Sequence, residues 1–292
     1  MDALDIADPI AAEDIAPVQR RRRRVGFGFA LAAGWIVFVL LLAIFANVLP
    51  IQSPTDADFL AKRAPPSAEH WLGTDNLGRD ELSRLIHGAR ISLTVGLCAP
   101  VIGVIAGGLL GLLAGYFRGR FEALVVGGVD VLLAFPPLVL ALAVTAYLGQ
   151  TIPNLVMVLG VLGIPAFTRV ARAATLSLAQ REFVVAARTL GATHARILFR
   201  ELLPNVALPL IAFFLLAVAV TIVVEGALSF LGLGVPPPAP SWGIMIGEGR
   251  ESLDIAPRLA FMPAAAMFLT VLAFNMVGDS LRALTDPRPG AL

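Results

Sequence analysis

The residues best equipped for chemistry are acids and hydroxyls set inside long apolar stretches. Thr221, Glu225 and Ser229 stand four residues apart, so on a helix they share one face. Asp130 lies in another apolar stretch. An acid inside a bilayer costs about 2.5–3.5 kcal/mol, and it therefore marks either a transport path or a hydrogen bond between helices. The sequence allows either role, lining a path or bonding two helices, for each of these four residues.

The motifs of common enzymes and metal sites are absent from the sequence. It contains no G-x-x-x-x-G-K-[ST] loop, no H-E-x-x-H pair and no G-x-S-x-G elbow. Cys98 is the single cysteine, which excludes an intrachain disulfide and a cysteine metal cluster. We therefore expect a non-catalytic chain that binds no metal and no cofactor. The net charge of +1 gives no reason to expect nucleic acid.

Composition identifies the environment of these residues. Only 15% of the 292 residues are charged and 58% are hydrophobic, whereas about a quarter of a soluble domain is charged. A span needs about 20 apolar residues. The sequence predicts an all-α integral membrane protein with six such spans, at residues 26–49, 91–116, 122–148, 153–173, 206–232 and 259–280. Pro136 and Pro137 should kink the third span.

Charge placement predicts the orientation. Most of the 22 basic residues fall on one side of the membrane if both termini are cytoplasmic. Residues 1–25 then form a disordered cytoplasmic tail with acids and a block at Arg20–Arg24, and 283–292 form a second tail. Residues 50–90 would be extracytoplasmic, with a short interfacial helix around Leu82–Ile86. Trp242 would anchor the second external segment at the interface.

Four glycines in the second span form a regular pattern. Gly103, Gly107, Gly111 and Gly115 are spaced four residues apart. On a helix they make a ridge without side chains, which lets a neighbouring helix approach closely. We expect a packing surface, although the sequence does not identify the partner helix.

Residues 174–205 are polar although apolar spans flank them, and the topology places them in the cytoplasm. The pattern predicts a helix to Leu190, a glycine end at Gly191, and a second amphipathic helix to Leu203. Pro204 should end that second helix. From the residues alone, the segment is either a connector resting on lipid headgroups or a docking element for a cytoplasmic partner.

Several long motifs support the docking interpretation. The stretch "AARTLGA" followed by "ILFRELLPN" resembles the EAA loop of ABC importer permeases with the type I transmembrane fold. Three more stretches, "GTDNLGRDELSRLIHGARISL", "DVLLAFPPLVLAL" and "EGALSFLGLGVPPPAPSWGIMI", narrow this to the C-type permease subunit of dipeptide and oligopeptide importers. The resemblance covers residues 70–290, with a permease core at 91–282.

The resemblance implies a machine of several subunits. A second homologous permease, two ATPase subunits that bind ATP and Mg, and an extracytoplasmic substrate-binding protein would complete an importer in the bacterial cell membrane. The EAA loop would couple ATP hydrolysis to alternating access. Its implied coupling residues are Glu182, Ala186, Ala187, Arg188, Gly191, Ala192, Ile197, Leu203 and Pro204. Val185 departs from the family, which usually has glutamate there, so that acid's contact with the ATPase does not carry over.

Three alternatives remain open at this stage. Nickel, glutathione or haem could replace peptide as the cargo of the same machinery. A proton-coupled secondary transporter could use Asp130 or Glu225. A membrane scaffold without transport activity would need none of these partners.

Overall fold

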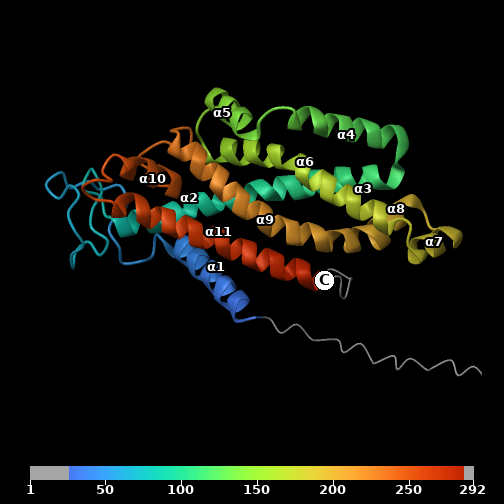
Figure 1. Cartoon of the computed structure of the whole chain (residues 1–292), viewed down its shortest axis with the longest axis horizontal. Coiled ribbons are helices and arrows are strands. Elements are labelled where there is room, and N and C mark those ends of the chain that lie inside the picture. Colours follow the sequence, from blue (N-terminus) through green and yellow to red (C-terminus); the bar gives the residue numbers. More distant parts are fainter. Residues whose placement is uncertain (1–25, 286–292) are drawn as a thin grey trace, which may run out of the picture.

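A computed structural model of the chain describes residues 26–285, which are helical except for connecting loops and one isolated β-bridge. The bundle is elongated (Figure 1): α10 and the loop at 46–80 lie at one end, called here the α10 end, and α7 lies at the other, the α7 end. The all-α fold predicted from the sequence is confirmed. The tail expected at residues 1–25 lies outside the described residues, as does most of the tail expected at 283–292, of which residues 283–285 belong to the last helix.

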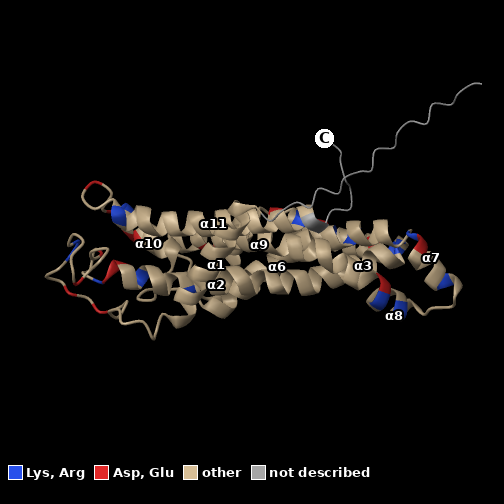
Figure 2. Cartoon of the chain, turned by 90° about the horizontal axis from the view of Figure 1, so that it is seen from below, with Lys and Arg blue, Asp and Glu red and all other residues tan. Residues whose placement is uncertain are grey.

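Five helical runs are long and apolar enough to cross a membrane, and a bent helix pair makes a sixth. Figure 2 shows that charged residues gather mostly at the two ends of the bundle, while its middle is almost free of them. An uncharged middle matches the hydrocarbon core of a bilayer. The chain is therefore a multi-pass membrane protein.

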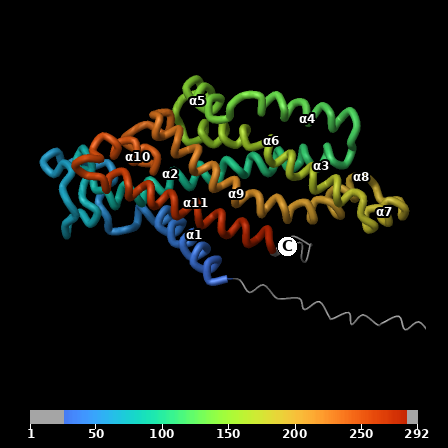
Figure 3. The backbone as a smooth tube through the Cα atoms, in the orientation of Figure 1, coloured from blue at the N-terminus to red at the C-terminus, as the bar shows by residue number. Residues whose placement is uncertain are grey.

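The first and last spans lie side by side. They are α1 (Phe27–Phe45) and α11 (Arg258–Thr285). The indole Nε1 of Trp35 donates to Thr270 Oγ1 at 3.1 Å, and a Cβ added to Gly28 would lie 3.1 Å from Met276 Cε. In Figure 3 the first turns of α1 and the last turns of α11 both lie away from the α10 end and close to one another. This fits an even number of crossings, and the cytoplasmic orientation of the termini stays a prediction.

The second span is longer than the sequence pattern suggested. It consists of α2 (Glu81–Ile102), a π-helical segment (Gly103–Gly107) and α3 (Gly108–Phe117) without a break. The Asp80 carboxylate accepts a hydrogen bond from the Ser83 N–H and so starts the helix. The separate interfacial helix expected around Leu82–Ile86 is therefore wrong. Those residues form the first turns of α2, because the polar positions among them are buried against other parts of the chain.

The third span is broken rather than kinked. Helix α4 (Gly119–Leu133) and α5 (Pro137–Leu148) meet at an angle of 80°. Pro137 occupies the first position of α5, where a missing N–H is tolerated, and Pro136 stays extended. Two adjacent prolines thus end one helix and begin another.

The remaining helices complete the bundle. Helix α6 (Ile152–Leu178) leads into α7 (Glu182–Thr189) and α8 (His194–Arg196). A π-helical segment, Ile197–Leu202, then continues into α9 (Leu203–Phe230). Helix α10 (Trp242–Arg250) precedes α11. Thr151 and Ser241 cap α6 and α10 through hydrogen bonds from the N–H groups of Asn154 and Ile244.

Trp242 does not anchor the chain at the membrane surface as expected. Its side chain is 1% exposed, and its Nε1 donates to the Leu85 carbonyl at 3.0 Å. Trp242 packs in a core formed by α1, α2, α9 and α11. The expectation fails because an amphipathic ring can bury fully once its N–H has a partner.

Candidate functional site

The predicted coupling segment forms the tip of the α7 end. The chain leaves α6, forms the short helix α7, reverses at residues 190–193 and returns through α8 (Figure 1). Gly191 has a φ of +79°, a conformation that glycine adopts without strain and other residues adopt at a cost. Gly191 therefore ends α7 as predicted from the sequence.

One correction concerns the second predicted helix. Residues 194–230 form a single helical run, so Pro204 lies inside it rather than at its end. Pro204 is in the first turn of α9, directly after the π-helical segment, where the wider backbone turn accommodates the missing N–H. The coupling segment is thus one short helix, α7, followed by a turn at residues 190–193 and a helical run that continues into the fifth span.

A buried apolar group fixes this segment to the bundle. Val184 on α7 is 0% exposed, and it packs with Ile197, Leu198 and Leu202. The same cluster includes Leu112 of α3 and residues of α6 and α9. Burying a valine or leucine side chain contributes about 1.5–3 kcal/mol. Any force on α7 is therefore transmitted to α3, α6 and α9.

The opposite face of the segment is open. Val185 is 53% exposed and Leu190 is 87% exposed. The other predicted coupling residues divide between the two faces. Exposed ones are Glu182, Ala186, Arg188, Gly191, Leu203 and Pro204; Ala187 and Ala192 are half-buried, and Ile197 is buried. Apolar side chains left in solvent beside charged ones are typical of a surface that binds another protein.

Polar and aromatic contacts brace the segment against α3. The Tyr116 hydroxyl and His194 Nδ1 are 2.7 Å apart, and the Arg188 guanidinium lies 5.9 Å from the centre of the Tyr116 ring. Stacking of a cation over an exposed ring contributes about 0.5–1 kcal/mol. Tyr116 was not singled out by the sequence analysis, because its partners are 72 and 78 residues away.

The polar stripe on α9 is enclosed rather than open. The Glu225 side chain is 0% exposed and accepts hydrogen bonds from Ser229 Oγ at 2.6 Å and Ser92 Oγ at 2.9 Å. Ser92 Oγ also accepts from the Trp242 N–H at 3.3 Å. Thr221 is half-buried and donates to the Ala217 carbonyl. In this conformation the Glu225 carboxyl joins α2, α9 and α10, and a path-lining role for the stripe stays a prediction.

Asp130 lies on the broken third span and is paired. Its carboxylate accepts a hydrogen bond from Arg169 of α6 at 2.7 Å, and both side chains are more than half exposed. A second pair, Glu122 and Arg172, joins the same two helices at 2.7 Å. Exposed pairs contribute about 0–1 kcal/mol each. These contacts position α4 on α6 without excluding a role for Asp130 along a path.

The glycine ridge packs against α6. A Cβ added to Gly107 would lie 2.8 Å from the Phe167 Cβ, and one added to Gly111 would lie 2.6 Å from the Ala171 Cβ. Gly103 and Gly115 approach Phe167 and Thr175 in the same way. The helix that the sequence analysis did not identify is therefore α6 of the same chain.

The α10 end contains a charged cluster that the sequence analysis missed. Arg84 is 1% exposed, and its Nη2 is 2.7 Å from Glu248 Oε2. Arg79 contacts the same oxygen at 2.9 Å and Asp75 Oδ2 at 2.5 Å. We call Asp75, Arg79, Arg84 and Glu248 the ion cluster. The sequence analysis placed the residues around Leu82–Ile86 on an interfacial helix, and no local pattern indicated that α10 would cover their charges.

Comparisons with known proteins agree with this architecture. The model of the family described as binding-protein-dependent transport system inner membrane component matches residues 107–290. A glutathione transport system permease protein GsiD of Pectobacterium atrosepticum is 44% identical over 263 residues, which covers 89% of this chain and 87% of that protein. The protein of the same name in Escherichia coli O157:H7 is 44% identical over 92% of this chain and 89% of its own.

A solved structure shares the fold at low sequence identity. It is the MetNI methionine ABC transporter in inward facing conformations, with a TM-score of 0.58 and 19% identity. The match covers 70% of this chain and 97% of that chain. At this identity the likeness concerns the arrangement of helices alone.

Proposed function

We propose that this chain, which belongs to the family of binding-protein-dependent transport system inner membrane components, carries di- or oligopeptides into a bacterial cell. It is a multi-pass membrane permease of an ABC importer. Its sequence contains none of the enzyme motifs considered in the sequence analysis. Family membership replaces the proton-coupled transporter and the scaffold as explanations. The relatives named for glutathione transport favour that tripeptide as a second candidate cargo.

The open face of α7 carries the proposal of coupling. Val185 and Leu190 are exposed, while Val184 on the other face is buried in the core shared by α3, α6 and α9. We infer that an ATPase subunit covers the exposed face and moves the bundle through Val184. In this arrangement Val185 offers an apolar contact where the family usually offers an acid.

The remaining parts of the machine follow from that docking. The α7 end would lie in the cytoplasm, and residues 46–80 with α10 would face a substrate-binding protein outside. Two ATPase subunits would bind ATP and Mg, and a second permease subunit would complete the path. ATP binding and hydrolysis would select between inward-open and outward-open states of the pair.

Substitutions on the open face test the coupling. Arg188→Glu and Gly191→Trp should leave membrane insertion intact but lower peptide uptake per ATP hydrolysed at least 10-fold, because they change the charge and the shape of the docking face. The measurement is uptake and ATP hydrolysis by the complete importer in proteoliposomes. Arg120→Glu makes the same charge change at the α7 end outside the segment, and it should leave the ratio unchanged.

A conservative change at the glycine provides a second control. Asparagine tolerates positive φ better than most residues, so Gly191→Asn should retain most of the coupling. Normal uptake per ATP in both Arg188→Glu and Gly191→Trp would contradict the docking assignment.

A further inference from the structure

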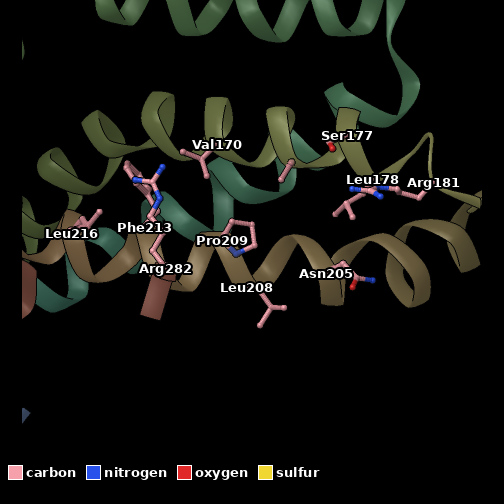
Figure 4. A pocket seen from close by; sticks show the side chains of 12 residues that line it. Val170, Ser177, Leu178, Arg181, Asn205, Leu208, Pro209, Phe213, Leu216 and Arg282 are labelled. Atoms are coloured by element: carbon pink, nitrogen blue, oxygen red, sulfur yellow. The ribbon is translucent and has the colours of Figure 1, made fainter. Parts of the chain in front are cut away.

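Two cavities near opposite ends of the bundle differ in size and in charge. Near the α7 end, a pocket of about 630 Å³ opens between α6 and α9, and most of the side chains that line it are apolar, such as Leu208 and Phe213 (Figure 4). At the α10 end, a cavity of about 10 Å³ lies among residues of the ion cluster. A space of that size holds one water molecule at most. The smaller cavity contains a carboxyl group that the contacts described so far do not explain.

This group is the side chain of Glu81, the first residue of α2. Glu81 is 2% exposed, and its Oε1 has no hydrogen-bond partner within residues 26–285. It lines the cavity together with Asp75, Arg84 and Glu248. An ionised carboxylate is strongly unfavourable in a buried position unless donors or cations meet it. Glu81 therefore needs either such a partner or a proton of its own.

The neighbouring arginines are already shared by other acids. Arg84 Nη2 lies 2.7 Å from Glu248 Oε2, and Arg84 Nε lies 3.2 Å from Asp75 Oδ2. Arg79 contacts the same two carboxylates. Two arginines thus balance two acids in the ion cluster, and Glu81 is a third acid beside them.

The other charged groups around Glu81 do not supply the missing contact. Arg258, the first residue of α11, donates through Nη2 to two backbone carbonyls of the loop at 46–80, and it forms no ion pair with an acid of the described chain. Asp80 is paired with His70 at 3.0 Å. Among the described residues, no group of three or more His, Cys, Asp or Glu side chains is placed to hold a metal ion. The cation that this carboxyl can still take is a proton.

Glu81 lies beyond the hydrocarbon core of the bilayer. The helical run from α2 to α3 has 37 residues. It is therefore about 55 Å long, whereas the core is about 30 Å thick. The excess falls at the α10 end, where charged side chains gather (Figure 2).

The surroundings of Glu81 favour its neutral form. Burial raises the pKa of Glu81 to about 8. The charges of Asp75 and Glu248 add to this rise, and those of Arg84 and Arg258 oppose it. The carboxyl is therefore mostly protonated at neutral pH.

We propose that Glu81 is a proton-binding site that fastens the α10 end at neutral and acidic pH and loosens it as the pH rises. With its proton, Glu81 adds no charge to the ion cluster. Loss of the proton places a third negative charge beside Asp75 and Glu248, in a cavity too small for solvent to screen it. The contacts that join the loop at 46–80, α2 and α10 then weaken. This response to pH goes beyond the transport function proposed above and does not depend on the cargo.

Proton linkage gives the direction and the steepness of the response. In the loosened form, Glu81 is exposed and has the ordinary pKa of 4.5, whereas in the closed form its pKa is about 8. Because the closed form binds the proton more tightly, closure is fully favoured below pH 4.5, and this advantage is lost as the pH rises to about 8. Within that interval, the ratio of loosened to closed form should rise about 10-fold per pH unit, and it should level off at higher pH.

Hydrogen exchange of the full chain in phosphatidylcholine nanodiscs measures this opening. Protection factors, which are exchange rates corrected for the intrinsic rate at each pH, are obtained for the amides of α10 from about pH 5.5 to about pH 9.5. They should fall about 10-fold per pH unit up to about pH 8 and then level off. Amides in the middle of α6 are the internal reference and should show no such change.

Variants identify the group responsible. Glu81→Gln keeps the size and polarity of the side chain but has no proton to lose, so its protection factors should be constant over the whole range. Glu81→Met also lacks a carboxyl, and it should give the same constant values if the glutamine variant does not fold. Glu251→Gln removes an exposed acid at the end of α10, and it should retain the 10-fold dependence per pH unit.

Two results would overturn the proposal. One is protection at α10 that does not change with pH in the unmodified chain, the result expected if Glu81 is ionised and balanced by Arg258. The other is a pH dependence that persists in both Glu81 variants, which would assign it to another group such as the pair of His70 and Asp80. Because exchange is measured at α10 and without uptake, neither result bears on the coupling assignment at the α7 end.

Discussion

The two ends of the bundle use charge in opposite ways. At the α10 end, Arg79 and Arg84 are buried and paired with Asp75 and Glu248. At the α7 end, Arg181, Arg188, Arg196 and Arg200 are exposed, and none of them forms an ion pair within the described residues (Figure 2). The buried charges of the α10 end satisfy one another within the chain, whereas the four arginines of the α7 end are left for something outside the chain.

This difference indicates where the molecule is rigid and where it is incomplete. The ion cluster joins the loop at 46–80, α2 and α10. Asn76 Nδ2 also donates to the Glu248 carbonyl at 2.9 Å, and Asn76 Oδ1 accepts from Ser252 Oγ at 2.6 Å. At the α7 end, α7 has one buried residue, Val184, and a stacking contact between exposed Arg188 and Tyr116. A partner bound there would find a movable element with a prepared contact face.

The comparison predicts that the largest loss of stability follows damage to the α10 end. Arg84→Met leaves Arg79 as the one cation of the ion cluster facing both Asp75 and Glu248, and should lower the free energy of unfolding by about 3–5 kcal/mol. Denaturant unfolding of the purified chain in micelles measures this. Arg90→Met alters an exposed arginine of the same helix and should cost less than about 0.5 kcal/mol. Equal losses of stability in the two variants would contradict the conclusion that the paired buried charges stabilise the α10 end.

An intermediate loss of stability is expected when the packing of α3 against α6 is disturbed. Gly111→Ala forces a methyl group against Ala171 and should lower the free energy of unfolding by about 1–3 kcal/mol. Gly127 on α4 has open space around it, so Gly127→Ala should be neutral or slightly stabilising. The same unfolding assay distinguishes them. If both glycines tolerate alanine, the ridge does not join α3 tightly to α6.

The smallest loss of stability is expected at the α7 end. Tyr116→Phe removes only the hydroxyl that contacts His194, which should cost about 1 kcal/mol or less. If that contact braces the coupling segment, peptide uptake per ATP should nevertheless fall. Tyr147→Phe, at a residue 89% exposed, is the matched control. A stability loss as large as that of Arg84→Met would show that the two ends do not differ in this way.

Several features were predictable because they depend on near neighbours in the chain. The apolar runs predicted the spans, and the four-residue spacing of Gly103 to Gly115 predicted a packing ridge. Gly191 predicted the end of α7, since a glycine past a helix commonly adopts positive φ. Pro136 and Pro137 predicted a disruption, although not its 80° angle.

Other features depend on partners that are distant in sequence. Whether Leu82–Ile86 began a separate helix depended on what covered Arg84, and Glu248, which covers it, is 164 residues away. The same holds for Glu225, whose partner Ser92 lies 133 residues earlier, and for Trp242, which donates to Leu85. A polar pattern looks identical in a solvated helix and in a buried one that finds its partners.

The sequence by itself determined the membrane fold, the positions of the spans and the family, because hydrophobic length and local motifs are properties of consecutive residues. Only the tertiary structure decided which charges are buried and which are exposed, and which faces of α7 and α9 are open. Burial of an ionised group is favourable only when an opposite charge and hydrogen bonds meet it there. That condition is set by helices that approach one another from distant parts of the chain.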